Sequence, residues 1–245
     1  MALTWLTGAS SGIGFDLAKE LQARGQPLVV SARSMAPLAQ LAAHEGTNAL
    51  PLDVTMRDKV ADAVAKIEQD FGPIETAIFN AGTHLPVEGD QFNADGFSWL
   101  MNVNVMGVVH CLEAVIPAMV ARGRGRIVIV ASVAGYRGLP TASYYGATKA
   151  ALINMAEALR LDLKKHGIVV QLVNPGFVKT PLTDKNEFPM PFLMDSKVAA
   201  KRFADGIETD KFEITFPRRF AMILKLLRML PYALYFPLVG RGTGK

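Results

Sequence analysis

The sequence predicts an α/β fold: a single domain built on a doubly wound parallel sheet of about seven strands, with helices on both faces. Two observations lead to this prediction. Short apolar runs alternate with longer amphipathic segments along the whole chain. Most of the short runs are continuously apolar rather than alternating in polarity, as in parallel strands that are covered on both faces. Repeated β-α units of this kind imply right-handed crossovers.

Seven runs are the expected strands, and five amphipathic segments between them are clear helices. The strands are expected at residues 2–7, 27–32, 48–52, 76–80, 126–131, 169–174 and 212–216. The helices are expected at residues 13–24, 35–44, 57–71, 97–121 and 144–166. No composition break precedes about Lys179. We therefore expect one domain over residues 1–217 and an extension at 218–245.

The composition argues against several classes of protein. The chain has 245 residues, of which 50% are hydrophobic and 20% charged, so it can bury a large core and is not expected to be disordered. The formal net charge of +4 comes without a basic stripe interleaved with aromatics, so nucleic acid is not an expected partner. We find no signal peptide and no run of 18 uncharged apolar residues, and therefore expect no transmembrane helix.

The single cysteine and the four histidines suggest no special chemistry. Cys111 cannot form an intramolecular disulfide, which fits a reducing compartment and a cytoplasmic location. It lies in an expected helix and is interpreted as a small core residue. The histidines have no metal-ligand spacing among themselves or with Cys111, so no metal site is expected. They are His44, His84, His110 and His166.

A glycine-rich loop follows the first expected strand and opens the first expected helix, at residues 7–14. Gly8 permits a tight turn, Gly12 lets the backbone approach a pyrophosphate, and Gly14 lets the helix and strand pack closely. The helix N-terminus directs N–H groups and a partial positive charge towards an anion. This context predicts a Rossmann-type dinucleotide site. The expected cofactor contacts here are Gly8, Ser10, Ser11, Gly12, Ile13 and Gly14.

The end of the second strand indicates which dinucleotide is bound. An acidic side chain there would hydrogen-bond the ribose hydroxyls. The sequence instead has Ala32 followed by Arg33, and a guanidinium can bind a 2′-phosphate bidentately, whereas an acid would repel it. We therefore expect NADP(H), with Arg33 on its phosphate. The alternative is that Arg33 is a solvated residue at a strand end.

Three residues are expected to carry acid/base chemistry. Tyr145 and Lys149 are four residues apart and project from one face of the expected helix, whereas Tyr144 lies about 140° away from Lys149 and is expected to pack or line a pocket. A nearby ammonium favours the phenolate and lowers the pKa of a tyrosine. Ser132 follows the fifth strand, at the edge where open α/β sheets bind ligands, and could hydrogen-bond a substrate oxygen.

Taken together, these motifs resemble the short-chain dehydrogenase/reductase family, over residues 3 to about 216. Each motif is short, but their order and spacing are jointly specific. The matching elements are residues 7–14, Asp53-Val54, Asn80-Ala81-Gly82, Asn104, Ser132, Tyr145, Lys149, Asn174-Pro175-Gly176 and Thr180.

The resemblance implies roles that the residues themselves do not reveal. Asp53 and Val54 would bind the adenine end of the cofactor, and the turn of Asn80, Ala81 and Gly82 would lie beside the cofactor. Asn104 would be catalytic, by holding a water that extends a proton relay from Lys149; Asn102 is its nearby competitor.

The resemblance also implies a nicotinamide side of the site and an assembly. Pro175, Gly176, Val178 and Thr180 would line the nicotinamide, and Tyr145 and Lys149 would contact the cofactor as well. A homodimer or homotetramer would form on the helices at 97–121 and 144–165. A lid at about residues 179–196, within the domain at 1–217, would cover the substrate.

This expected lid is rich in apolar side chains, which favours an apolar substrate. The alternative is that these residues only anchor the lid to the domain. The apolar residues are Leu182, Phe188, Met190, Phe192, Leu193 and Met194.

The extension at 218–245 begins with a basic amphipathic helix. Arg218, Arg219, Lys225 and Arg228 share one half of its helical wheel, and apolar residues fill the other half. Residues 231–239 are apolar, interrupted by prolines and too short to span a bilayer. Such a segment can lie in a membrane interface, pack on a partner subunit or cover the substrate pocket.

The function expected from the sequence is an NADP(H)-dependent oxidoreductase that reduces a ketone or aldehyde, or oxidises an alcohol in reverse. Tyr145 would be the acid/base, and a small carbonyl or alcohol compound the substrate. The alternative is a non-catalytic dinucleotide-binding protein, either at a membrane surface or as an interaction protein that senses redox state. The complete set of Asn104, Ser132, Tyr145 and Lys149 favours the enzyme.

Overall fold

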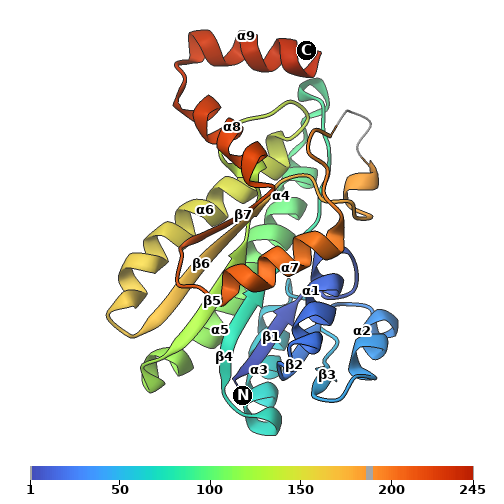
Figure 1. Cartoon of the computed structure of the whole chain (residues 1–245), viewed down its shortest axis with the longest axis vertical. Coiled ribbons are helices and arrows are strands. Elements are labelled where there is room, and N and C mark those ends of the chain that lie inside the picture. Colours follow the sequence, from blue (N-terminus) through green and yellow to red (C-terminus); the bar gives the residue numbers. More distant parts are fainter. Residues whose placement is uncertain (1, 186–189, 245) are drawn as a thin grey trace.

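Seven parallel strands form one sheet in the computed structural model, which describes residues 2–185 and 190–244 (Figure 1). Their order is β3-β2-β1-β4-β5-β6-β7. The strands are β1 (Leu3–Thr7), β2 (Leu28–Ser31), β3 (Thr47–Ala49), β4 (Ile74–Phe79), β5 (Gly125–Val130), β6 (Ile168–Pro175) and β7 (Glu213–Phe216). The prediction of a single-domain, doubly wound parallel α/β sheet is confirmed.

Helices cover both faces of the sheet (Figure 1). One layer contains α1 (Gly12–Ala23), α2 (Met35–Ala42) and α7 (Ser196–Ile207). The other contains α3 (Arg57–Phe71), α5 (Gly107–Arg122) and α6 (Ser143–Lys164). Successive side chains of a strand point to opposite faces, so Trp5 of β1 joins the core under α3, α5 and α6, and Leu6 joins the core under α1, α2 and α7.

The strand order reverses beside β1, which pairs with β2 on one side and with β4 on the other. In open α/β sheets the crevice at such a switch point, at the carboxyl ends of the strands, is where ligands bind. The glycine-rich loop follows β1, Asn80 follows β4, and Ser132 lies just beyond β5. The fold therefore brings three separate motifs to one edge of the sheet.

The segment expected as one helix at 97–121 is divided in three. It comprises α4 (Ala94–Met101), a π-helical turn η2 (Asn102–Met106) and α5. Asn93 caps its start, because the Asn93 side chain accepts a hydrogen bond from the N–H of Gly96. Among the described residues, this segment of 29 residues is long and apolar enough by composition to cross a membrane. It packs on β4, α3 and α6, so we interpret it as a core element.

Two further helices lie at the C-terminal end, α8 (Arg218–Met229) and α9 (Tyr232–Thr243). The basic amphipathic helix expected at 218 is present. Residues 231–239 were expected to be interrupted by their prolines, but α9 continues through Pro237. Short helical turns also occur at η1 (Gly89–Gln91), η3 (Val133–Gly135) and η4 (Thr183–Lys185).

Candidate active site

The glycine-rich loop is tied closely to the end of β4. Gly8 has φ of +71°, and a Cβ there would lie 2.7 Å from the backbone nitrogen of Ala81. A Cβ on Gly14 would lie 2.2 Å from the carbonyl oxygen of Gly8 and 2.4 Å from Nδ2 of Asn80. Asn80 Nδ2 donates to that same carbonyl at 3.0 Å. These distances leave no room for side chains, and Asn80 fixes the loop in place.

The first turn of α1 is open to an anion. Ser11 is the N-cap residue, but its side chain makes no capping hydrogen bond in the structure. A Cβ on Gly12 would lie 3.1 Å from Cγ2 of Thr180, so the loop borders the segment that follows β6. An uncapped helix N-terminus behind a glycine turn fits a pyrophosphate group, because its N–H groups and the helix dipole favour negative charge.

Arg33 and Asp53 lie together beyond β2 and β3, at the expected adenosine end. Burial raises the pKa of Asp53, but hydrogen bonds from Thr55 and the charge of Arg33 outweigh it and hold that pKa below its usual value. The N–H and hydroxyl of Thr55 donate to Asp53 Oδ1 at 2.9 and 2.7 Å. Arg33 itself is exposed, so its guanidinium is accessible to a ligand. Val54 is buried beside Gly107 and contributes to packing.

Tyr145 and Lys149 lie in the first two turns of α6 and face the same cleft as Ser132. The ammonium of Lys149 is buried, lies 5.6 Å from the centre of the Tyr145 ring and donates to the carbonyl oxygen of Val130 at 3.0 Å. The hydroxyl of Ser132 accepts from the N–H of Ala134 at 3.2 Å. Three groups that can donate or accept a proton therefore converge at the carboxyl end of β5.

Burial dominates the ionisation of this pair. It lowers the pKa of Lys149 to about 8. It also raises the pKa of Tyr145, against a hydrogen bond with Ser132 that lowers it. We expected Lys149 to lower the pKa of Tyr145, and in the structure that effect comes from Ser132 instead. The reason is that Lys149, with a pKa of about 8, is uncharged at the higher pH where the Tyr145 phenol titrates.

Asn104 lies in the π-helical turn and is fully buried, whereas its competitor Asn102 is exposed. Its side chain accepts from the N–H of Thr83 at 2.8 Å and donates to the Thr83 carbonyl at 2.9 Å. It also donates to the hydroxyl of Thr148 at 3.1 Å. Asn104 therefore joins the segment after β4 to the helix that carries Tyr145 and Lys149.

A cleft with about 560 Å³ of empty volume, open to solvent, unites most of these groups. Its lining includes ten predicted site residues: Ile13, Asn80, Gly82, Ser132, Tyr145, Lys149, Pro175, Gly176, Val178 and Thr180. The other predicted residues lie outside this lining: Gly8, Ser10, Ser11, Gly12, Gly14, Arg33, Asp53, Val54, Ala81 and Asn104. The first group surrounds the reactive end, and several of the second lie towards the expected phosphate and adenosine end.

Sequence reasoning missed several residues of this site. Thr83 and Thr183 line the cleft. The His84 ring lies edge-on to the Tyr145 ring, with 4.6 Å between ring centres. The short distance in sequence from Asn80-Ala81-Gly82 was the one available signal for Thr83 and His84.

The expected lid is anchored to the domain at its far end. Met194 forms a β-bridge with Val178, and its carbonyl accepts from the N–H of Lys179 at 2.8 Å. Phe192 and Leu193 are exposed rather than part of the cleft. Of the six apolar lid residues, Leu182 lines the cleft and Phe188 lies outside the described residues. For Met194, anchoring is the better interpretation.

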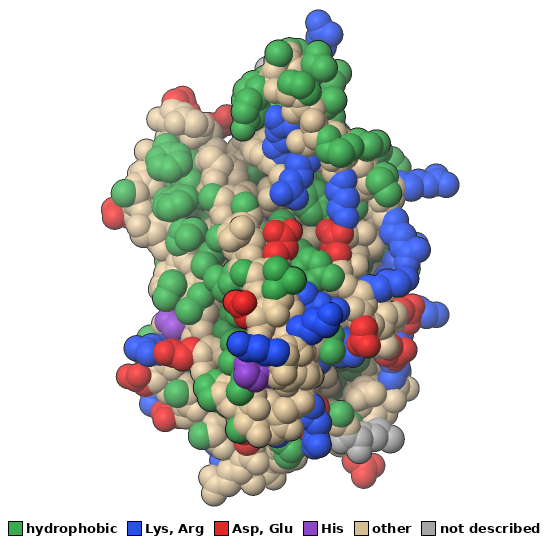
Figure 2. Space-filling view, turned by 90° about the vertical axis from the view of Figure 1, so that its left-hand side faces the viewer, with side chains coloured by type: hydrophobic (Ala, Val, Ile, Leu, Met, Phe, Trp, Pro, Cys, Tyr) green, Lys and Arg blue, Asp and Glu red, His purple; other side chains and the backbone are tan. Residues whose placement is uncertain are grey.

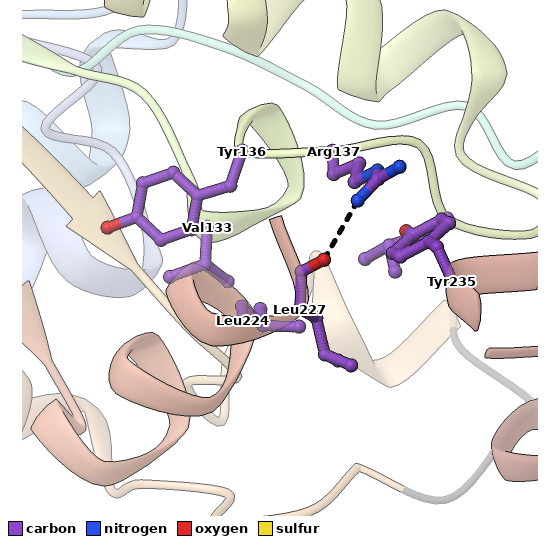
Figure 3. A pocket seen from close by; sticks show the side chains of 7 residues that line it. Val133, Tyr136, Arg137, Leu224, Leu227 and Tyr235 are labelled. Carbon is purple, nitrogen blue, oxygen red and sulfur yellow. Dashed lines mark hydrogen bonds between the residues drawn. The ribbon is translucent and has the colours of Figure 1, made fainter. Parts of the chain in front are cut away.

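A smaller hollow, with about 190 Å³ of empty volume that includes open solvent, lies between η3 and the C-terminal helices (Figure 3). Leu224, Leu227 and Tyr235 of α8 and α9 face Val133 and Arg137 across it. It is mostly apolar and contains none of the predicted site residues, so we interpret it as imperfect packing between the C-terminal helices and the domain. Among the described residues, no group of His, Cys, Asp or Glu is placed to hold a metal ion.

Comparison with known proteins decides the family. The model of the short chain dehydrogenases matches residues 3–189. The chain belongs to this family. The resemblance inferred from the motifs is thereby confirmed. This protein is an oxidoreductase with an α/β fold.

Similar proteins share both sequence and fold. An uncharacterized oxidoreductase of Myxococcus xanthus (strain DK1622) is 36% identical over 240 residues, which cover 94% of this chain and 93% of the relative. A short-chain dehydrogenase from Sphingobium yanoikuyae, solved in complex with NADPH, is 28% identical with a TM-score of 0.81, and the match covers 95% of this chain and 98% of that one. A short chain dehydrogenase/reductase from Burkholderia phymatum, in complex with NAD, has a TM-score of 0.83 over 92% of each chain; at 24% identity it shows the fold alone.

Proposed function

We propose that this short-chain dehydrogenase is an NADP(H)-dependent reductase of ketones or aldehydes, which oxidises the corresponding alcohols in reverse. The observation that carries the proposal is the convergence of Ser132, Tyr145 and Lys149 in one cleft at the switch point of the sheet. The non-catalytic alternative is not favoured, because a protein that only binds a dinucleotide would not require this complete set of acid/base groups.

The residues around the cleft fit a nicotinamide dinucleotide. The glycine turn and the uncapped start of α1 suit the pyrophosphate, and the walls at Pro175, Gly176 and Val178 suit the nicotinamide. When bound, such a cofactor supplies the hydride that reduces the carbonyl carbon.

NADP(H) rather than NAD(H) is the preferred partner in this proposal. Arg33 is exposed and lies near Asp53, and the uncharged Ala32 precedes it, so a 2′-phosphate would meet a cation there. The NADPH complex of the relative from Sphingobium yanoikuyae supports this choice. The competing charge is Asp53, whose carboxylate is already engaged by Thr55.

Tyr145 is the proton donor in the proposed reaction. Because burial raises its pKa, the phenol holds its proton at neutral pH, as a donor to a developing alkoxide must. The hydroxyl of Ser132 can donate a hydrogen bond to the same substrate oxygen. Lys149, with a pKa of about 8, exchanges a proton near neutral pH and can restore the phenol. Asn104 holds Thr83 and Thr148 around this group.

The substrate is proposed to be apolar around its carbonyl group. Leu182, an apolar residue of the lid, lines the cleft together with the polar groups, which suits a compound with one polar end. We also propose that the protein forms a homo-oligomer through the layer of α5 and α6. Met106 and Leu161, which are 42% and 77% exposed, are apolar side chains that such an interface would cover.

A carbonyl panel tests the proposed function. The purified chain is mixed with NADPH or NADH and with aliphatic, aromatic and polar ketones and aldehydes, and loss of reduced nicotinamide absorbance is followed. The proposal expects turnover with NADPH, higher kcat/KM for the apolar members, and slower turnover with NADH. Tight NADPH binding without turnover on any carbonyl would overturn it.

A further inference from the structure

The C-terminal helices expose an apolar surface. Six side chains define it, and we call it the tail surface: Met222, Leu226 and Met229 of α8, and Tyr232, Leu234 and Phe236 of α9. Each is between 54% and 73% exposed. Single exposed apolar residues are normal in soluble proteins, but six within 15 residues of chain form a cluster that indicates an interaction site.

The helices that carry the tail surface are firmly attached by their inner sides. Phe220, Ala221 and Leu224 of α8 are buried in the core under α3, α5 and α6. Arg137 donates to the carbonyl oxygen of Leu227 (Figure 3). It also donates to the carbonyl oxygens of Arg228 and Leu230, at the end of α8. The exposed residues are therefore on an element docked to the domain, not on a free end.

Arg137 also fixes α9. Its guanidinium lies 3.8 Å from the centre of the Tyr235 ring and 4.8 Å from that of Tyr232. The hydroxyl of Tyr235 donates to the carbonyl oxygen of Gly138. With α8 and α9 both held to the loop after η3, their outer sides face solvent at one end of the molecule (Figure 1).

The charged residues of the C-terminal segment, residues 218–245, are all basic. Residues 218–245 contain six Lys or Arg and no Asp or Glu, whereas the other 217 residues contain 20 basic and 22 acidic residues. Arg218 and Arg219 are exposed at the start of α8. Figure 2 shows hydrophobic and basic side chains gathered at this end of the molecule. Lys225 is paired with Glu213 of β7, and the other basic residues of this region lie beside an apolar surface, an arrangement complementary to an anionic partner.

The positive charge of residues 218–245 also disfavours a second copy of this chain as the partner that covers the tail surface. In a symmetric dimer the same patch meets itself. Basic residues would then face basic residues, without an acidic side chain from residues 218–245 to compensate. Tyr232 and Phe236 stack with 5.5 Å between ring centres, and aromatic rings with an apolar body suit the headgroup region of a bilayer.

We infer that α8 and α9 dock this enzyme on an anionic lipid surface, with the tail surface in the interface and the basic residues at the headgroups. The chain from Met229 to Gly240 has no charged residue, but its 12 residues are too few to cross a bilayer, so the contact is interfacial. The lid borders this element, because the Phe192 ring lies 6.0 Å from the Phe220 ring and Phe192 is itself exposed.

Vesicle flotation tests the inference on the full-length protein. Vesicles of phosphatidylcholine alone are compared with vesicles that also contain phosphatidylglycerol, for wild type and for the double variant Met222→Glu/Leu226→Glu. Both positions are exposed on α8, so the variant keeps the buried face. Val198→Glu is the matched control, because Val198 is 46% exposed on α7, away from the tail surface. NADPH titration and sedimentation of each protein report folding and oligomeric state.

The inference predicts that wild type and Val198→Glu float with the anionic vesicles, less at high salt, and that the double variant loses about tenfold or more of its partitioning. Replacing Arg218 and Arg219 by Gln should lower partitioning roughly fivefold for each residue. Wild type that stays unbound with anionic vesicles would overturn the inference. A double variant that floats like wild type would also overturn it. So would a double variant that changes its oligomeric state instead of its vesicle binding, because the tail surface would then be covered by a second copy of the chain.

Discussion

The ammonium nitrogen of Lys149 lies 5.6 Å from the centre of the Tyr145 ring, one helical turn away on α6. Both side chains face the cleft, but the ammonium is bonded to the Val130 carbonyl and buried. The pair is thus arranged for proton exchange at a cost to the folded state, since a buried cation is poorly solvated.

Replacing Lys149 by Met should stabilise the protein while reducing activity. The pKa of Lys149 is lower in the folded state, at about 8, than the ordinary 10.5, so the folded state binds fewer protons between these values. Wild-type stability should therefore rise with pH from about 8 to 10.5. The variant should gain up to about 3 kcal/mol at neutral pH and lose this pH dependence. Chemical denaturation across this pH range measures both effects.

Lys164→Met is the control for that variant, because Lys164 is exposed on the same helix. It should change neither the stability at neutral pH nor its pH profile. A Lys149→Met protein that is less stable than wild type at pH 7 would show that the bond to Val130 outweighs the desolvation.

Arg33→Ala should weaken NADPH binding about 10- to 100-fold and leave NADH binding nearly unchanged, because a charged hydrogen-bonded pair with the 2′-phosphate is lost. Fluorescence titration with each cofactor measures the change. Arg202→Ala is the matched control, since Arg202 is an exposed arginine on α7. Equal loss for NADPH and NADH, or none, would mean that Arg33 does not recognise the phosphate.

Arg137→Ala should loosen the C-terminal helices without altering the cleft. The guanidinium joins three carbonyl oxygens of α8 to the ring of Tyr235, so its loss should cost about 1–3 kcal/mol and expose residues near 230 to proteases. Limited proteolysis followed by mass spectrometry locates the cut. Arg137→Lys keeps the charge but not the planar fork and should be intermediate. An Arg137→Ala protein cut no faster than wild type would contradict this role.

Glu213→Gln should lower stability at neutral pH and reduce the sensitivity to acid. Burial raises the pKa of Glu213, but bonds from Lys225, Tyr136 and Asn174 outweigh it and hold that pKa below 4.5. A lowered carboxylate pKa stabilises the fold above the unfolded value, and this contribution disappears as pH falls through the folded value. Wild type should therefore lose about 1–2 kcal/mol more than the variant on acidification. Thermal unfolding over acidic and neutral pH tests this.

The strands and the core of the site could be predicted because their signals are local. Buried parallel strands are continuous apolar runs, and all seven were expected within a few residues of their observed bounds. The glycine loop and the four-residue spacing of Tyr145 and Lys149 also lie within short stretches of chain, and their places follow from the fold.

Other features depend on small residues or on distant contacts. Three of the five residues that the helix α7 buries are alanines, beside Phe203 and Ile207, and an alanine adds little to a hydrophobic pattern. The π-helical turn that holds Asn104 changes the backbone without changing the composition. The attachment of α8 through Arg137 joins residues about 90 positions apart, which no local pattern contains. The effect of burial on the pKa of Tyr145 could not be predicted either, because it depends on the three-dimensional surroundings of the ring.

The most direct test of the proposed chemistry compares two adjacent tyrosines. Tyr144 is buried, and its hydroxyl bonds both backbone groups of Asn93, whereas Tyr145 faces the cleft. With the best carbonyl of the panel and NADPH, Tyr145→Phe should lower kcat about 10²- to 10⁴-fold with an unchanged NADPH Kd. Tyr144→Phe should keep kcat within a few-fold and lose about 1–3 kcal/mol of stability. A Tyr145→Phe enzyme with wild-type kcat would contradict the assignment of Tyr145 as the proton donor.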